Sequence, residues 1–181
     1  MPIIGLTGYK GSGKSEVARI LERQGYARLR FAGAVKDMLR VLGLDDDELD
    51  GNLKEVPNPI LGGKTPRHAM QTLGTEWGRV MISDDLWTRV IERRLFEARA
   101  GELFVIDDVR FQNEAAMIRR MVGVIWRVYR AHFNTLSTHI SELGIADLGH
   151  DTFLVNDGTL DDLARRTLVL LSLPTPKENA T

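Results

Sequence analysis

The sequence predicts an α/β domain built around a mostly parallel, five-stranded sheet, and two observations support this fold class. Short apolar runs alternate with longer amphipathic stretches, which is the pattern of successive β–α units. One of the runs, residues 103–106 (LFVI), is wholly apolar, as expected for a central strand that is buried on both faces. With 181 residues and 43% hydrophobic side chains, the chain can bury a sizeable core. We therefore expect a three-layer sandwich with helices on both faces of the sheet.

The first elements alternate regularly. Residues 2–7 are predicted to form the first strand, and residues 14–24 form a helix with apolar side chains on one face. Residues 26–31 alternate between apolar and polar side chains and are predicted to be the second strand. Residues 34–42 are predicted to form the next helix, and the acidic residues 45–50 (DDDELD) form a short surface helix or turn.

The middle of the chain contains a long irregular segment and then helices. Residues 51–64 contain two prolines and three glycines and are predicted to form a long loop. Thr65 is placed to cap a helix that has Pro66 at its first position and extends to about Glu76. Asp84 or the next residue caps another helix, which ends near Arg99.

The last third of the chain returns to the alternation of strands and helices. After the apolar run at 103–106, residues 113–121 are predicted to be helical and residues 124–129 to form a strand. Residues 152–155 form the last strand. Residues 159–171 form the last helix, in which Asp162 stands where a capping box requires an acidic side chain.

Composition excludes several classes of protein. There are 24 Lys and Arg against 25 Asp and Glu, so bulk charge does not favour nucleic acid or an anionic membrane as a partner. The absence of cysteine excludes disulfides, cysteine-bound metals and a thiol nucleophile. No apolar run approaches the length of a membrane span, and the first residues lack the basic and apolar regions of a secretory leader. We therefore expect a cytoplasmic protein.

Residues 8–15 (GYKGSGKS) form a complete G-x-x-x-x-G-K-S motif between the first strand and the first helix. In such a loop, glycines let backbone N–H groups surround a phosphate, and the helix directs its positive end at the same anion. Lys14 is placed to reach the β- and γ-phosphates, and the Ser15 hydroxyl is placed to bind Mg²⁺. The motif predicts a nucleoside triphosphate site formed by Gly11, Ser12, Gly13, Lys14 and Ser15.

The loop alone does not choose among kinases, GTPases and motor or switch ATPases. A GTPase would be expected to carry an N-K-x-D motif, which this sequence lacks, and a motor ATPase domain is usually longer. Three further segments favour a second substrate. The first is Lys36, which follows the second strand at the sheet edge where ligands of α/β proteins bind. The alternative interpretation of Lys36 is a solvated lysine on a surface helix, without a role in substrate binding.

The second segment is the helix that Thr65 opens. Arg67 and Gln71 are four residues apart and share one face, which offers a guanidinium for phosphate and an amide for a base edge. Glu76 and Arg79 either belong to this site or form a surface salt bridge, and Trp87 either stacks on a base or packs in the core. Gly74 and Gly78 lie on the same segment and would weaken a long helix. Their presence indicates that the backbone conformation or packing at this segment has a specific role.

The third segment follows the strand at 103–106. Asp107 and Asp108 both stand at its carboxyl end, where a P-loop protein places a magnesium-binding carboxylate, and periodicity does not choose between them. Arg110 is two residues further along and is expected to reach the same site.

Six motifs occur in order: G-x-x-x-x-G-K-S, F-A-x-x-x-K, T-P-R-x-x-x-Q-x-L-G-T-E-x-G-R, D-V-R-F-x-N-E, H-I-S-E and N-D-G-T-L-x-D-L. Over about residues 3–170 the sequence resembles the deoxynucleoside monophosphate kinases, a family best known from bacteriophages. One difference is Gly-Ala at 33–34, where the family pattern has Asp-Pro. The resemblance implies a nucleoside monophosphate kinase-like P-loop fold, ATP as donor, Mg²⁺, and a deoxynucleoside monophosphate as acceptor.

The resemblance also implies roles for individual residues. It favours Asp108 as the functional acid. Asp108 and Ser15 are then the two residues expected to bind the metal. It places Asn156 and Gly158 near the adenine of ATP, and it makes residues 131–151 a lid with His139 and Glu142. Arg127 and Arg130 at the root of the lid are candidates to stabilise the transferred charge, so the catalytic set is Lys14, Asp108, Arg110 and Arg130. The acceptor site would consist of Lys36, Arg67, Gln71, Thr75, Glu76, Arg79, Trp87 and Arg110.

On this interpretation residues 1–171 form a single kinase domain, with an acceptor-binding region at about 33–100 and a flexible tail at 172–181. The expected partners are ATP and the monophosphate, and we expect neither nucleic acid nor a membrane as a partner. A homodimer is compatible with the sequence, which does not decide the oligomeric state. Two other functions are compatible with the residues. One is a kinase of another small phosphorylated metabolite, of the dephospho-coenzyme A or phosphomevalonate type. The other is an ATPase switch that transfers nothing.

Overall fold

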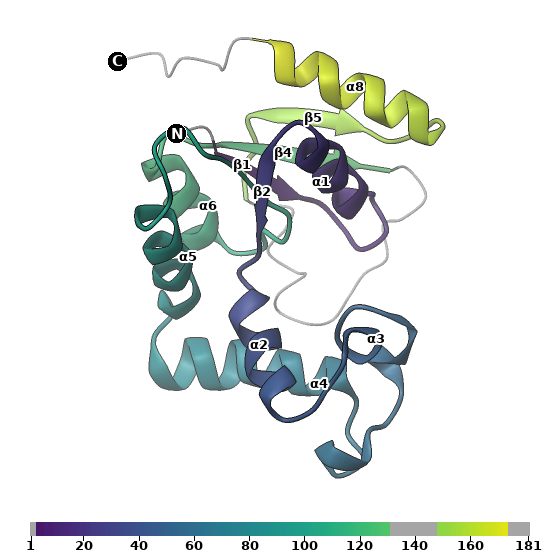
Figure 1. The fold of residues 1–181 in the computed structure, drawn as a ribbon, viewed down its shortest axis with the longest axis vertical. Helices are drawn as coiled ribbons and strands as arrows, with labels where there is room; N and C mark the ends of the chain where they lie inside the picture. Colours follow the sequence, from purple (N-terminus) through teal and green to yellow (C-terminus); the bar gives the residue numbers. More distant parts are fainter. Residues whose placement is uncertain (1–2, 131–147, 174–181) are drawn as a thin grey trace. The chain divides into compact units, whose positions relative to one another are not determined.

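The computed structural model of the chain describes residues 3–130 and 148–173. The chain divides into two compact units, one formed by Met1–Leu29 with Ala98–Thr181 and one formed by Arg30–Glu97. Figure 1 shows the elements of both units. No helix within the described ranges is long and apolar enough to cross a membrane.

The first unit contains a five-stranded sheet in which every neighbouring pair is parallel, as the sequence predicts. The strand order is β2-β3-β1-β4-β5. The strands, which match the predicted runs to within two residues, are β1 (Ile3–Thr7), β2 (Tyr26–Leu29), β3 (Leu103–Ile106), β4 (Val124–Tyr129) and β5 (Thr152–Val155). The second strand ends at Leu29 rather than at residue 31, because the next residues form a turn in which Gly33 N–H donates to the Arg30 carbonyl (3.0 Å).

Helices cover both faces of this sheet. Among the described residues of this unit, the helices are α1 (Lys14–Arg23), α6 (Gln112–Arg120) and α8 (Leu160–Ser172). Ile4 and Leu6 of β1 belong to a buried cluster with side chains of α1 and α8. The opposite face packs on α6, where a β-carbon at Gly5 would lie 2.7 Å from Ile118 Cδ1. The predicted three-layer arrangement is confirmed.

The last helix begins as predicted. Thr159 Oγ1 accepts from the Asp162 backbone N–H (3.2 Å), and Asp162 Oδ2 accepts from the Thr159 N–H (3.0 Å), which completes the capping box. The Thr159 hydroxyl also donates to Asp162 Oδ2 (2.8 Å), and this bond, the bond from the Thr159 N–H and the nearby Arg165 lower the pKa of Asp162.

The second unit, Arg30–Glu97, contains helices and connecting turns but no strand. Its α-helices are α2 (Gly33–Val41), α3 (Asp46–Leu49), α4 (Pro66–Gln71) and α5 (Leu86–Phe96). The segment predicted as a long loop, 51–64, instead contains two 3₁₀ turns, η1 (Asn52–Glu55) and η2 (Pro59–Leu61). The second turn forms because Asn58 Oδ1 accepts from Ile60 N–H (2.7 Å) and Pro59 has the backbone angle of a first helical position.

The helix opened by Thr65 is longer than predicted and changes type. After α4, the chain continues as a π-helix, η3 (Thr72–Ile82), so helical structure extends six residues past the predicted end at Glu76. The next helix, α5, ends at Phe96, three residues before the predicted end at Arg99. Thr65 caps α4 as predicted, since its hydroxyl accepts from the His68 N–H (3.2 Å).

Candidate functional site

The loop between β1 and α1 has the conformation that an anion-binding loop requires. Gly8, Gly11 and Gly13 all have positive φ, at 139°, 82° and 106°. Gly13 forms the N-cap of α1, and a β-carbon there would collide with the side-chain amide of Asn156. A residue other than glycine would therefore be both strained and displaced at Gly13. The sequence pattern and the backbone agree on a phosphate-binding loop.

Lys14 lies against this loop. Its Nζ donates to the carbonyl oxygens of Gly8 (2.6 Å) and Tyr9 (2.9 Å), so the ammonium group is held at the loop that precedes it. Ser15, at the second position of α1, has an exposed side chain. A cation within the loop and a hydroxyl at the helix N-terminus are the groups that the motif predicts for a triphosphate and its metal.

Two buried hydroxyls beside the loop have no hydrogen-bond partner among the described residues. These are Thr7 Oγ1, at the end of β1, and Ser12 Oγ, on a residue that is only 2% exposed. A buried hydroxyl without a partner costs about 1–3 kcal/mol, so such groups are usually satisfied by a ligand or water. The unsatisfied Ser12 hydroxyl therefore fits a phosphate bound in the loop.

A residue far along the chain also contacts the loop. Asn156, directly after β5, donates from Nδ2 to the Ser12 carbonyl (2.9 Å). The resemblance places Asn156 and Gly158 near adenine, and sequence reasoning missed the contact with the loop. Gly158 lies close to α8, where a β-carbon would be 2.7 Å from Asp162 Oδ2. The adenine roles of both residues stay predictions.

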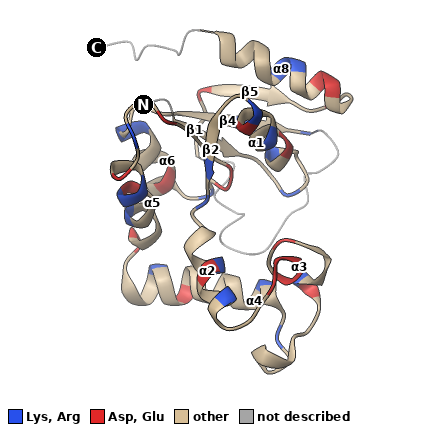
Figure 2. Cartoon of the chain, in the orientation of Figure 1, with Lys and Arg blue, Asp and Glu red and all other residues tan. Residues whose placement is uncertain are grey.

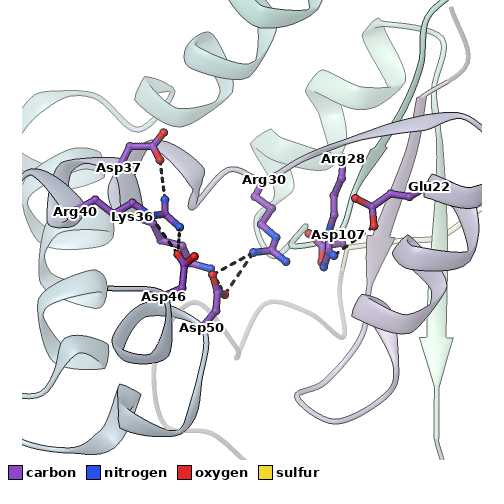
Figure 3. Close-up of polar contacts among 9 residues, drawn as sticks. All are labelled: Glu22, Arg28, Arg30, Lys36, Asp37, Arg40, Asp46, Asp50 and Asp107. Carbon is purple, nitrogen blue, oxygen red and sulfur yellow. Dashed lines mark hydrogen bonds and ion pairs between the residues drawn. The ribbon is translucent and has the colours of Figure 1, made fainter. Parts of the chain in front are cut away.

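The two carboxylates after β3 differ in their surroundings. Asp107 is 5% exposed and forms an ion pair with Arg28 of β2, and Arg28 also lies 3.7 Å from Glu22 (Figure 3). Asp108 is half-buried, in the segment that Val109 ties to β1 by donating to the Leu6 carbonyl (3.2 Å). The structure thus gives Asp107 a structural partner that sequence reasoning missed. Asp108 as the functional acid stays a prediction.

Arg110 stands on a backbone that is fixed by a buried carboxylate. Glu114 of α6 is 2% exposed and accepts from the N–H groups of Arg110 (2.7 Å) and Phe111 (3.1 Å). Glu114 was not among the predicted site residues, and the sequence carries no capping-box signal for it, because the N-cap residue Phe111 has no side-chain acceptor. Carboxylate and hydroxyl oxygens, as on Asp108 and Ser15, are the donors that Mg²⁺ prefers.

The remaining predicted residues of the first unit lie on or after β4. Arg127 is half-buried, and its Cα is in register with Thr7 at the end of β1. Arg130 is exposed, just past the strand. His139 and Glu142, predicted to belong to a lid, lie outside the described residues.

In the second unit, Lys36 belongs to a charged cluster. It is 7% exposed, on α2, and its Nζ forms an ion pair with Asp50, which also lies 3.3 Å from Arg30 Nη1 (Figure 3). Burial raises the pKa of Asp50, but the hydrogen bond from Lys36 and the charges of Lys36, Arg30 and Lys54 outweigh it, so the pKa is lowered overall. The buried position contradicts the alternative of a solvated lysine.

Arg67 and Gln71 lie one turn apart on α4, as predicted. Arg67 forms an ion pair with Glu55 of η1, and Gln71 is half-buried. The first turn of α3 consists of the acidic residues Asp46, Asp47 and Glu48, and Figure 2 shows this part of the ribbon in red. The second unit therefore holds its predicted phosphate-binding cations next to carboxylates.

Gly78 of η3 makes room for Trp87. The Trp87 indole is 4% exposed and donates from Nε1 to the Gly74 carbonyl (2.7 Å). A β-carbon at Gly78 would collide with the Trp87 ring. The packing of Trp87 therefore explains the glycine at position 78. A β-carbon at Gly74 would meet Val35 Cγ2 at an ordinary 3.7 Å, so Trp87 packing does not require glycine there.

Arg79 and Glu76 are not equivalent. Arg79 is buried and donates to the backbone carbonyl of Asp84 (3.0 Å), whereas Glu76 is exposed. The alternative of a surface salt bridge therefore does not describe Arg79. Thr75 is half-buried on the same π-helix.

Comparisons with known proteins agree with this geometry. The sequence model of the family "deoxynucleotide monophosphate kinase" matches residues 51–167. A putative deoxynucleotide monophosphate kinase of Acanthamoeba polyphaga mimivirus is 32% identical over 177 residues, which cover 90% of this chain and 92% of that protein. The deoxynucleoside-5'-monophosphate kinase of Escherichia phage T5 is 33% identical over 88 residues, 45% of this chain and 35% of that protein. Among solved structures, the dephospho-CoA kinase from Campylobacter jejuni has a TM-score of 0.52 at 13% identity, with 94% of this chain and 96% of that chain covered, which shows a shared fold.

Proposed function

The chain belongs to the deoxynucleotide monophosphate kinase family, and on that premise we propose that it transfers a phosphoryl group from ATP to a deoxynucleoside 5'-monophosphate. The observation that carries the proposal is the loop of residues 8–15, which holds Lys14 and a buried Ser12 hydroxyl with no hydrogen-bond partner among the described residues, just before the N-terminus of α1. The products are ADP and the deoxynucleoside diphosphate.

The reaction is a direct, in-line displacement. An oxygen of the acceptor's phosphate attacks the γ-phosphorus, the bond to the β–γ bridging oxygen breaks, and ADP leaves with that electron pair. Lys14 binds the β- and γ-phosphates, and Arg110 and Arg130 are the further cations proposed to stabilise the charge of the transferred group. The chain has no cysteine, and the mechanism needs no covalent enzyme intermediate.

Magnesium, when bound, neutralises charge on the phosphates. The Ser15 hydroxyl and the Asp108 carboxylate are the residues proposed to hold it. The acceptor is proposed to bind residues of the second unit together with Arg110. These residues are Lys36, Arg67, Gln71, Thr75, Glu76, Arg79 and Trp87.

ADP release measured against a panel of acceptors tests the function. The panel contains the deoxynucleoside and ribonucleoside monophosphates, dephospho-coenzyme A, phosphomevalonate and a reaction without acceptor. We expect ADP release that depends on a deoxynucleoside monophosphate. Activity with one of the other metabolites alone would reassign the substrate, and slow turnover without regard to acceptor would indicate an ATPase switch.

The variant Lys14→Ala links the activity to the loop. We expect kcat to fall by at least about 100-fold, because charge stabilisation on the transferred phosphoryl group is usually the largest catalytic contribution. Lys64→Ala, which removes an exposed lysine in the second unit, is the matched control and should retain activity. Circular dichroism checks the fold, and near-wild-type turnover by folded Lys14→Ala would contradict the assignment of the nucleotide site.

A further inference from the structure

We propose that Asn156 is a positioning residue for the phosphate loop, which sets the loop's conformation and thereby the affinity for the phosphates of any donor nucleotide. The proposal rests on the proposed function and deepens it. This role differs from adenine recognition. A residue that shapes the loop affects binding of the triphosphate group, which all nucleoside triphosphates share.

The contact that carries the proposal is buried and specific. Asn156 is 8% exposed, and its Nδ2 donates to the Ser12 carbonyl at 2.9 Å, across 144 positions of sequence. The same nitrogen occupies the space that a side chain at Gly13 would need. The amide of Asn156 is thus fitted to the Ser12–Gly13 peptide.

This bond fixes the orientation of one peptide group in the loop. In a planar trans peptide, the carbonyl of Ser12 and the N–H of Gly13 point in opposite directions. With the carbonyl bound to Asn156, the Gly13 N–H is held facing the other way. A carbonyl turned into the loop would repel phosphate, whereas inward N–H groups bind it, so the bond favours the binding conformation.

The backbone of Asn156 and both of its chain neighbours are held by hydrogen bonds. Its backbone N–H donates to the Tyr129 carbonyl of β4 (2.7 Å). Arg166 of α8 donates from Nη1 to the Val155 carbonyl and to Asp157 Oδ1, both at 2.7 Å. The neighbours of Asn156 on both sides are therefore tied to α8, and the side chain presents a fixed donor to the loop.

The variants Asn156→Ala and Asn156→Asp test this role against adenine recognition. We expect kcat/KM for ATP, GTP and CTP to fall by the same factor, roughly 3- to 10-fold for the alanine variant, since a single hydrogen bond is lost. The Kd for inorganic tripolyphosphate with magnesium, measured by calorimetry, should rise by a similar factor. Asn52→Ala removes an exposed asparagine of the second unit and should change neither quantity.

The aspartate variant keeps the shape of the side chain, so it gives the answer if the alanine variant does not fold. Its ionised carboxylate cannot donate to the Ser12 carbonyl, whereas the protonated acid can. We therefore expect its kcat/KM relative to the wild type to rise as pH is lowered. A pH-independent ratio would contradict the proposal.

Stability without ligand gives a further test. Loss of a bond within the protein should lower the unfolding temperature of the ligand-free Asn156→Ala protein, whereas loss of a pure ligand contact leaves it unchanged. A fall in kcat/KM for ATP alone, with unchanged tripolyphosphate binding, would overturn the proposal in favour of adenine recognition. Because tripolyphosphate binding requires no turnover, the test stands even if no monophosphate is phosphorylated.

Discussion

Two adjacent carboxylates at the end of β3 are expected to have separate tasks. Asp107 is enclosed and paired with Arg28, while Asp108 is half-buried. We expect Asp108→Asn to lose magnesium-dependent activity by about 100-fold with little change in stability, as for a group that stabilises transferring phosphate. Asp107→Asn should instead lower the free energy of unfolding by roughly 2 kcal/mol, because Arg28 loses a buried counter-charge. Steady-state kinetics and urea unfolding of both variants would measure this.

A double substitution separates the two effects. Arg28→Met combined with Asp107→Asn removes both partners, so it should recover part of the stability lost in the single variant. It should leave the requirement for Asp108 unchanged. A larger loss of activity in Asp107→Asn than in Asp108→Asn, both folded, would move the functional acid to Asp107.

At the scale of one element, α4 is predicted to bind the acceptor. Arg67→Ala should raise KM for the monophosphate by about 10-fold or more, because a charge-assisted bond to phosphate is lost. The Kd for ATP should change little. Gln71→Ala should change the ranking among bases, because an amide reads hydrogen-bonding edges. Measurement of kcat/KM for each base with each variant checks both expectations.

The ion pair on α4 provides the matched control. Glu55→Gln removes the partner of Arg67 and keeps the guanidinium. If Arg67 serves only this pair, both variants should have the same small effect, since exposed pairs contribute about 0–1 kcal/mol. If Arg67 binds phosphate, only Arg67→Ala raises KM. Equal KM values for both variants and the wild type would place the acceptor elsewhere.

The π-helix η3 is expected to depend on the absence of a side chain at Gly78. Gly78→Ala would place a methyl group against the Trp87 ring and should destabilise the protein by about 1–3 kcal/mol, as other overpacked sites do. Gly33→Ala, at the start of α2 where the nearest atom is 3.9 Å away, should be neutral or slightly stabilising. Thermal unfolding distinguishes the two, and equal unfolding temperatures would show that Trp87 can move aside.

The elements that the sequence predicted are those with local causes. All five strands were found because each is a short apolar or alternating run next to a turn or loop signal. The change from α4 to a π-helix could not be predicted, because it accompanies the packing of Trp87 on Gly74, 13 positions earlier. The contact of Asn156 with Ser12 has no local signature either, since the two lie at opposite ends of the chain. The phosphate loop was predictable because all its groups are consecutive.

For the whole molecule, the proposed direct transfer predicts the kinetic order. Residues predicted to bind the donor belong to the first unit, and most of those predicted to bind the acceptor belong to the second. Direct transfer requires both substrates to be bound at once. Initial-rate plots at varied ATP and monophosphate should therefore intersect. Parallel lines, or a phosphorylated enzyme trapped without acceptor, would contradict direct transfer.

The position of β1 in the sheet predicts how readily its backbone amides exchange with solvent. This strand is bonded to β3 on one side and β4 on the other, and all five of its residues are buried. Backbone amides in such a strand exchange with solvent only when the whole sheet opens, whereas edge strands and helix ends exchange through small local fluctuations. We therefore expect the phosphate loop to follow directly after a strand whose amides exchange slowly. Local unfolding at edge strands or helix ends should therefore leave β1, from which the phosphate loop begins, in its folded position.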